Sequence, residues 1–288
     1  MKREDESIGF ILILFLILPW LLTVIIQGRQ VCPVEREISI EEYIPAVTAS
    51  QISWDYDKEA IKAQTVLVRN LLYISQEKGE EQELISQASD FLKRKKMSAQ
   101  DLVRFQEFQK AAEETKGELL TLDGEIKEIP YHALSQGKTR DGKEILGDAF
   151  SYLPSVDTSK DIDSPLYVEG CYFTLEELTE KLRKEYTGFS MDEGKTAEVK
   201  EVDSVGYVME IQIGTQVFQG EKIKELLELP SSCFTVQELE GQIRFLCRGI
   251  GHGMGMSQYT AQKLALEGKN YRDILKYFFP DLEIVDNS

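Results

Sequence analysis

The 288-residue chain is poor in histidine, and its basic residues are far outnumbered by acidic ones. Only two histidines occur, and 50 Asp and Glu against 33 Lys and Arg give a formal charge of −17. Nucleic-acid binding requires clustered basic residues, so this balance argues against DNA or RNA as a partner, and it also argues against electrostatic docking to anionic lipid. A neutral ligand, or one recognised through hydrogen bonds and stacking, fits the composition better.

Several motifs that identify common functions are also missing. The four cysteines form no CxxC pair, which excludes the usual zinc clusters. No GxxxxGK[ST] or GxGxxG pattern is present, so a phosphate loop is not indicated. Without a GxSxG elbow, a Ser-His-Asp hydrolase with Ser135 or Ser257 as nucleophile remains a weak alternative. The chain has no internal repeat and no low-complexity segment.

A run of 19 residues without charge, residues 8–26, is the longest apolar segment. A helix of roughly 20 apolar residues spans the hydrocarbon layer of a membrane. A cleaved signal peptide is the alternative, but no small-residue cleavage site follows. We therefore expect a short cytoplasmic tail (1–7), a single-pass transmembrane anchor (8–27), and a domain at 33–284 on the extracytoplasmic side of the cell membrane.

The sequence that follows the apolar run predicts an α+β domain in which helices and antiparallel strands alternate irregularly. Asp57 is placed to cap a helix that opens at Lys58, because apolar residues then recur at spacings of three and four. Asp123-Gly124 is a strong hairpin signal after a strand-like run. The other expected elements are a short approach strand within 33–50, one or two surface helices forming an insertion at about 76–116, a capping-box helix at 174–186, alternating segments at 205–218, a hairpin at 234–246 around Glu240-Gly241, and helices at 257–267 and 271–278.

The stretch RGIGHGMGMSQY, residues 248–259, carries glycine at four alternate positions around His252. A tight backbone path explains such glycines, since glycine accepts positive φ. A crowded binding cleft explains them too, because alternate glycines remove the side chains from one face of an extended segment. That second interpretation is the one we favour from the sequence, although His252 itself is as readily a packed histidine as a functional one.

The second histidine lies in a similar stretch, YHALSQGKTR, residues 131–140. His132 stands near Ser135, Gly137 and Thr139, and a polar turn is the simpler explanation of these residues. Because both histidines follow strand-like segments and lie in polar loops that contain glycine, we expect them to share a site.

Four segments together resemble the family of stage II sporulation protein D and the LytB amidase enhancer. They are EEYIPAVTASQISWDYDKEAIKAQTVLVRN (41–70), TKGELLTLDGEIKEIPYHALSQGKT (115–139), QGEKIKELLELPSS (219–232) and RGIGHGMGMSQYTAQKLALEGKNYRDILKYFFP (248–280). The resemblance implies an exported, membrane-anchored protein. Sporulation members act on peptidoglycan glycan strands as lytic transglycosylases and prefer strands whose stem peptides an amidase has removed. The implied partners are therefore glycan strands, a cell-wall amidase and other membrane proteins of a wall-remodelling complex.

This chain departs from the family at the catalytic acid. The family pattern places a Glu eight residues before the Glu of an E-A-x-K-A-Q helix, which is Glu59 here, and that position holds Gln51. Glutamine cannot deliver a proton, and general acid catalysis contributes about 10² to 10⁴ in rate. We therefore expect a catalytically degenerate glycan-binding protein. The alternative is an active lytic transglycosylase that uses another carboxylate, such as Asp55, Asp57 or Glu59.

The remaining site residues follow from the resemblance, as neutral donors, acceptors and aromatic rings around Gln51. Trp54 is expected to border the same groove, while Gln64 and Arg69 could instead brace the core. The expected substrate-binding set is Gln64, Arg69, Tyr131, His132, Ser135, Gly137, Thr139, His252, Ser257, Gln258 and Tyr259.

We expect no metal and no other cofactor. Some relatives build a metal site from the histidine of the YH loop and nearby cysteines, but here Cys171 is the first cysteine after His132. Cys233 and Cys247 should lie nearly opposite one another in a hairpin. Buried thiols are favoured over a disulfide there, because bridges directly across paired strands demand constrained geometry.

Overall fold

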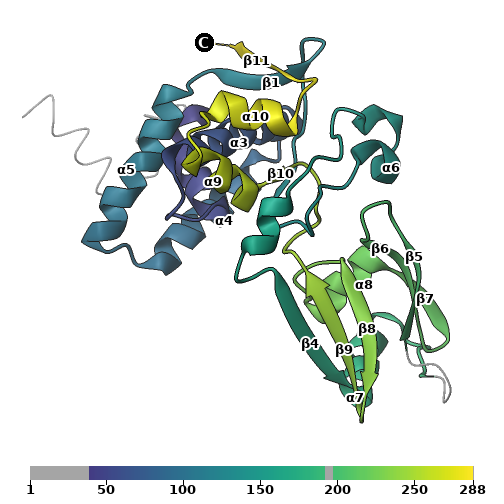
Figure 1. Ribbon diagram of the computed structural model, residues 1–288. Coiled ribbons are helices and arrows are strands. Elements are labelled where there is room, and N and C mark those ends of the chain that lie inside the picture. The colour runs from purple at the N-terminus through teal and green to yellow at the C-terminus, as the bar shows by residue number, and fades with distance from the viewer. Residues whose placement is uncertain (1–38, 192–196, 288) are drawn as a thin grey trace, which may run out of the picture. The chain divides into compact units, whose positions relative to one another are not determined.

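The computed structural model describes residues 39–191 and 197–287 and shows the expected α+β architecture (Figure 1). The chain divides into two units, Met1–Glu42 and Tyr43–Ser288. Only the 3₁₀ turn η2 (Ile40–Glu42) is described in the first, and the second carries the rest of the fold. The expected tail and anchor lie outside the described residues. Among the described residues, no helix combines the length and the apolar character needed to cross a membrane.

The helical part of the second unit is made from both ends of the chain. The long helix α3 packs against α10, and the C-terminal strand β11 pairs antiparallel with β1, aligning Asp286 with Glu118. The elements are α2 (Ile44–Gln51), α3 (Lys58–Lys78), α4 (Glu81–Lys95), α5 (Ala99–Glu114), β1 (Glu118–Leu122), β2 (Glu125–Ile126), α9 (Gln258–Leu266), α10 (Tyr271–Phe278) and β11 (Glu283–Asp286).

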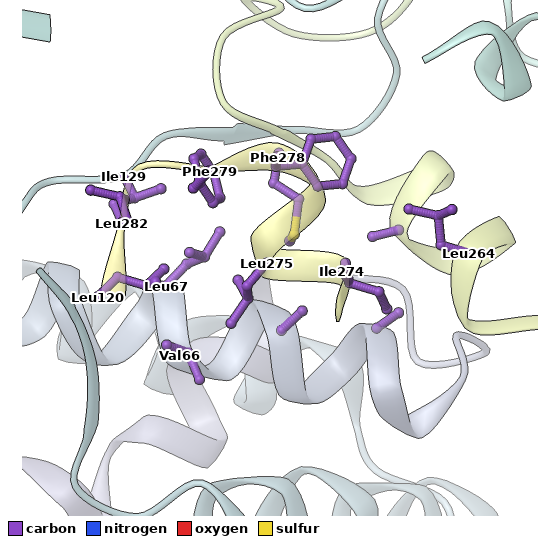
Figure 2. Packing of buried hydrophobic residues seen from close by; sticks show 14 of the residues in the cluster. Val66, Leu67, Leu120, Ile129, Leu264, Ile274, Leu275, Phe278, Phe279 and Leu282 are labelled. Carbon is purple, nitrogen blue, oxygen red and sulfur yellow. The ribbon is translucent and has the colours of Figure 1, made fainter. Parts of the chain in front are cut away.

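One apolar cluster holds these segments together. Figure 2 shows Val66 and Leu67 of α3 facing Leu275 and the neighbouring side chains of α10. These positions are at most 1% exposed. Complete burial of such a side chain contributes about 1.5–3 kcal/mol, so the contact between α3 and α10 is a main source of stability in this part.

The middle of the chain forms two three-stranded antiparallel sheets around a second apolar core. Helices α7 and α8 contribute Leu178, Leu182 and Ile223 to that core. One sheet has the order β4-β9-β8 and the other β5-β6-β7. The elements are β4 (Val168–Thr174), α7 (Leu175–Glu185), β5 (Ala197–Val202), β6 (Val208–Ile213), β7 (Gln216–Gln219), α8 (Gly220–Leu227), β8 (Phe234–Leu239) and β9 (Gln242–Arg248).

Short segments connect the two parts. They are β3 (Tyr131–His132), α6 (Gly142–Leu146), two 3₁₀ turns, η3 (Asp148–Phe150) and η4 (Ser159–Asp163), and β10 (Met256–Ser257). β3 and β10 pair in parallel, so that His132 lies opposite Ser257. This pairing brings the two histidine-containing stretches together.

Local signals in the sequence predicted most of these elements. The Asp57 side chain accepts a hydrogen bond from the Glu59 amide at the start of α3, and Thr174 and Glu177 form the expected capping box on α7. The Asp123-Gly124 turn has φ of 53° and 81°, the pair of positive values that a type I′ hairpin requires. The hairpin at Glu240-Gly241 and the helices within 76–116, 257–267 and 271–278 are also confirmed.

The expected approach strand within 33–50 is wrong where the chain is described, because α2 occupies Ile44–Gln51. Pro45 stands in the first turn of this helix, where its missing N–H costs no hydrogen bond. Residues 33–38 lie outside the described residues. Helices α4 and α5 pack on α2 as well as on α3, so the insertion covers the helix that ends at Gln51.

The described cysteines are free thiols, as favoured from the sequence. Cys247 pairs with Phe234 across the β8–β9 hairpin, and Cys233 immediately precedes that pair. Both side chains are at most 3% exposed. Burial raises the pKa of the Cys233 thiol to about 11. A thiol with so high a pKa forms little thiolate at neutral pH and reacts slowly.

Candidate functional site

Three glutamine side chains from three helices meet where the family pattern places its acid. Gln51 ends α2, Gln64 lies on α3, and Gln258 begins α9. Gln258 Nε2 donates to the main-chain carbonyl of Gln51 at 2.8 Å and to Gln64 Oε1 at 3.1 Å. Gln64 Nε2 in turn lies 3.5 Å from Gln51 Oε1, at the limit of hydrogen bonding. We call Gln51, Gln64 and Gln258 the glutamine cluster; it contains amides and no carboxyl group.

Access to the glutamine cluster is confined to Gln51. Its side chain is half-buried, whereas Gln64 is fully buried and Gln258 is 6% exposed. The following loop carries Trp54, whose indole N–H donates to the Ala49 carbonyl at 2.6 Å. The Trp54 ring packs on Phe108 with the centroids 5.4 Å apart. These contacts hold the Trp54 ring in a defined position in the loop that follows Gln51.

The three carboxylates proposed as substitutes for the acid are engaged in structural contacts. Asp55 is exposed and pairs with Arg104 at 2.8 Å. Asp57 caps α3. Glu59 contacts Lys62 at 2.9 Å and accepts a hydrogen bond from the Tyr271 amide. Partial burial raises the pKa of Glu59, but Lys62 and the Tyr271 amide outweigh that effect and leave the pKa below its usual value.

Because of Glu59, the unfolding free energy of the protein should decrease as the pH falls. Its pKa in the folded protein is lower than in the unfolded chain, so its contribution is present above the unfolded value and is lost as pH falls through the folded one. We expect Glu59→Gln to lose less unfolding free energy than wild type between pH 6 and pH 3, measured by urea denaturation. A wild-type acid dependence retained in full by Glu59→Gln would contradict this assignment.

A buried carboxylate that the sequence analysis missed, Asp161, lies on η4 and organises the neighbouring loops. It is fully buried and accepts hydrogen bonds from the Ser135 amide at 2.6 Å, from Ser257 Oγ at 2.8 Å and from Thr260 Oγ1 at 2.7 Å. Burial raises its pKa, and these donors oppose the rise. No local pattern marks Asp161, because each of its donors lies at least 26 residues away in the chain.

The two serines considered as nucleophiles are parts of this network. Ser257 Oγ donates to Asp161 and accepts from the Thr260 amide, which makes it the N-cap of α9. Ser135 Oγ shares a hydrogen bond with Thr158 Oγ1 and accepts from the Gly137 amide. Both serines are fully buried. Within the described residues neither hydroxyl bonds to a histidine, so the hydrolase alternative has no geometric support.

The two histidines do come together. Their ring centroids lie 5.9 Å apart with the rings inclined by 62°. Burial and the neighbouring His252 lower the pKa of His132 to about 3, and burial also lowers the pKa of His252. His132 Nδ1 bonds to the Met254 carbonyl, and His252 Nδ1 accepts from the Met254 amide. Both rings are therefore neutral near pH 7, and both order the glycine-rich stretch.

The four alternate glycines line a tight backbone path, and our interpretation of them as the open face of a cleft is wrong. All four have positive φ, between 72° and 108°. A Cβ on Gly255 would lie 1.9 Å from the Pro130 carbonyl oxygen, and one on Gly253 would lie 2.3 Å from the Tyr207 ring. Atoms of the protein itself, rather than a ligand, fill the space that the missing side chains leave.

Four expected substrate contacts are corrected by their complete burial. Arg69 donates to the Thr115 hydroxyl and to the carbonyls of Glu118 and Ala112, so it braces the core, as the alternative interpretation held. Thr139 Oγ1 donates to the Pro154 carbonyl and accepts from the Val156 amide. Ser135 and Ser257 belong to the Asp161 network, and all four residues are 0% exposed.

The other expected residues fall into two groups. Gly137 has a φ of 119° and lies in the buried loop beside Ser135, while His132 is 3% exposed. Tyr131 and Tyr259 are half-buried. His252 lines a cavity of about 610 Å³ together with Arg140 and Glu221, whose side chains form a 3.0 Å ion pair. Five candidates keep partial solvent exposure, namely Gln51, Trp54, Tyr131, His252 and Tyr259. Of these, the Trp54 ring also has Lys95 Nζ 4.4 Å from its centroid. Among the described residues, no three His, Cys, Asp or Glu side chains are grouped to hold a metal ion.

Comparisons with known proteins agree with the resemblance seen in the sequence. Residues 29–122 match the family described as Stage II sporulation protein. The chain is 29% identical to Stage II sporulation protein D of Bacillus amyloliquefaciens and to that of Bacillus subtilis, in both cases over 86% of this chain and 75% of the relative. It is also 24% identical to an uncharacterised protein of Brachyspira hyodysenteriae, over 88% of this chain and 68% of that protein.

Proposed function

Because the chain belongs to the stage II sporulation protein D family, we propose that it binds peptidoglycan glycan strands during sporulation or wall remodelling without cleaving them. The proposed site is centred on Gln51, with the half-buried Trp54 and Tyr259 as candidate sugar contacts. Cleavage would require an acid to protonate the glycosidic oxygen as its bond breaks, and the proposed protein lacks that acid.

The glutamine cluster is the observation that carries this proposal. An amide at Gln51 can bond to a sugar hydroxyl but holds no transferable proton. Gln258 Nε2 is already committed to the Gln51 carbonyl and to Gln64 Oε1. These bonds hold the main chain at Gln51 and the amide of Gln64, and the Gln51 side chain lies among amides rather than carboxyl groups.

The active alternative requires another protonated carboxyl group at this surface. Glu59 does not fit, because its lowered pKa keeps it ionised near neutral pH. Asp57 is held by the first turn of α3, and Asp55 is exposed and paired with Arg104. Asp161 has the raised pKa that a general acid needs, but it is fully buried beneath α9. These contacts favour a protein that binds glycan strands without cleaving them.

The proposal includes a location and partners. A single-pass anchor at 8–27 would hold the domain at the outer surface of the cytoplasmic membrane. A cell-wall amidase that removes stem peptides, and other membrane proteins of a remodelling complex, would work beside it. The mature N-terminus tests the anchor directly: a start beyond residue 26 contradicts it.

The decisive experiment measures binding and cleavage on the same substrate. Full-length protein in neutral detergent is incubated with glycan strands whose stem peptides have been removed, and bound protein and released sugars are quantified. We expect the protein to sediment with the strands and to release no anhydro-muropeptides. Release of anhydro-muropeptides at a substantial rate would show that the protein cleaves the strands and would contradict the proposal. Failure to sediment with the strands would contradict the assignment of a glycan ligand.

A further inference from the structure

The cavity beside His252 carries groups that the proposed function does not use. It encloses about 610 Å³, within the range of roughly 300–1,000 Å³ that is typical of ligand sites, and no residue of the glutamine cluster lines it. Its walls come from α6, from the sheet β5-β6-β7, from the start of α8 and from the glycine-rich stretch. Ile145, Leu146 and Met209 make part of the wall apolar, and Leu146 is 46% exposed. An apolar group of a ligand would cover this leucine.

Two carboxylates of this cavity stand opposite one another on neighbouring strands. Glu201 of β5 pairs with Glu210 of β6 in the antiparallel register, and both residues line the cavity. We call them the carboxylate pair. Like charges in directly opposed positions destabilise a sheet. The register also shifts on both sides of Glu201, as in a β-bulge, a feature that re-aims side chains and is frequent beside functional sites. Both side chains are exposed, and within residues 39–191 and 197–287 neither forms an ion pair with Lys or Arg.

The cations that line the cavity are committed to other carboxylates. Glu221 contacts Arg140 at 3.0 Å and Lys224 at 2.7 Å. Arg140 also contacts Asp203 at 2.6 Å. His252 adds no positive charge near pH 7, because burial lowers its pKa. In the described part of the chain, the carboxylate pair is therefore left without a cation, which favours a ligand that brings one.

One edge of the Arg140 guanidinium has no oxygen acceptor among the described residues. The side chain is 2% exposed; its Nη1 donates to Glu221 and to the His252 carbonyl, whereas Nη2 donates to Met209 Sδ at 3.2 Å. A thioether is a weak acceptor, and a buried charged donor without a good partner costs free energy. Arg140 and Met209 both line the cavity, so a ligand oxygen there would give Nη2 a stronger acceptor. A neutral carbonyl suits this position better than a carboxylate, because the guanidinium already has two negative partners.

We propose that this cavity binds a lysine side chain presented by a peptide segment of a partner protein. The ammonium would lie at the carboxylate pair, the alkyl stem would cover Leu146, and a main-chain carbonyl of the segment would accept from Arg140 Nη2. A basic segment also complements the chain's net charge of −17, which would speed its association. A metal ion fits less well, because no three His, Cys, Asp or Glu side chains of the described residues are grouped to hold one. The site does not depend on glycan binding.

The test uses two small peptides and two double variants. Nα-acetyl-lysine methylamide carries the ammonium, the alkyl stem and two carbonyls, and Nα-acetyl-norleucine methylamide lacks only the ammonium. Glu201→Gln with Glu210→Gln removes the carboxylate pair. The control, Glu176→Gln with Glu180→Gln, removes two exposed carboxylates one turn apart on α7, outside the cavity lining. Dissociation constants are measured by ligand-observed NMR on the full-length proteins in neutral detergent, and stability is measured by urea denaturation.

We expect wild type to bind the lysine peptide about three- to tenfold more tightly than the norleucine peptide, as two exposed ionic contacts imply. The variant without the carboxylate pair should lose this preference, yet its urea midpoint should rise, because the repulsion between the strands is relieved. The control variant should keep the preference. Equal binding of the two peptides by wild type, or a preference retained without the carboxylate pair, would overturn the site. Loss of the preference together with a lower urea midpoint would assign the pair to the fold and would overturn the site as well.

Discussion

Gln51→Glu should convert the protein into an enzyme that cuts peptide-free glycan strands, about 10² to 10⁴ faster than wild type, the range that a general acid contributes. Glu and Gln have nearly the same shape, so the change should leave the end of α2 intact. The new carboxyl would be half-buried, in a chain segment that continues with Ile52, which is 5% exposed, and Trp54. Desolvation there raises its pKa and favours the protonated acid.

The surrounding amides act in the opposite direction. Gln64 Nε2 lies 3.5 Å from the side-chain oxygen of residue 51, and a donor at that position stabilises the ionised carboxylate. At that length the hydrogen bond is weak, so burial decides the direction and the pKa rises. The rate of Gln51→Glu should therefore fall as pH increases through the new pKa.

Release of anhydro-muropeptides from stripped strands measures this gain. Gln76→Glu makes the same change of charge at an exposed position on α3 and should stay inactive. Equal and substantial cleavage by wild type and Gln51→Glu would mean that position 51 is not the acid. No cleavage by either protein would show that the loop around Ile52 no longer supports catalysis.

Asp161→Ala should cost about 3–9 kcal/mol of unfolding free energy. Three buried donors lose their acceptor, namely the Ser135 amide and the hydroxyls of Ser257 and Thr260. Each buried donor left without a partner costs about 1–3 kcal/mol. The start of α9 should loosen first, because Ser257 is its N-cap.

Asp161→Asn is the matched control, since it keeps the shape and one acceptor oxygen. The pKa of Asp161 is raised, so the folded protein binds this proton more tightly than the unfolded chain does. The ionised form is therefore the costly one, and the contribution of Asp161 to stability improves as pH falls through its folded pKa. Asn should consequently lose less than Ala at pH 7 in a urea titration. A loss below about 1 kcal/mol for Asp161→Ala would contradict the network.

Elements marked by local chemistry were predictable from the sequence. The cap at Asp57, the Thr174–Glu177 capping box and the Asp123-Gly124 turn each depend on residues within a few positions of one another, and all three form as predicted. The helix at Ile44–Gln51 was missed because the alternation before it was extended too far, although Pro45 in its first turn was a usable signal.

The site was only partly predictable, because its contacts join distant segments. Gln51, Gln64 and Gln258 do cluster, but Arg69 and Thr139 were assigned to a ligand and instead satisfy backbone groups inside the core. A polar residue in a family motif looks alike in sequence whether it contacts substrate or braces a loop. The same holds for Gly255, since only the position of the Pro130 carbonyl shows what fills the space beside it.

The pairing of early and late segments of the chain affects how the protein can fold during its synthesis. Residues 283–286 pair with 118–121, and the core around Val66 is completed by Leu275 and Phe278. During synthesis from the N-terminus, this core cannot form until α10 and β11 have been made. Such long-range closure is slow and keeps apolar surface exposed meanwhile. The delay makes a chain that stops before α10 a target for proteolysis, because its apolar surface stays exposed.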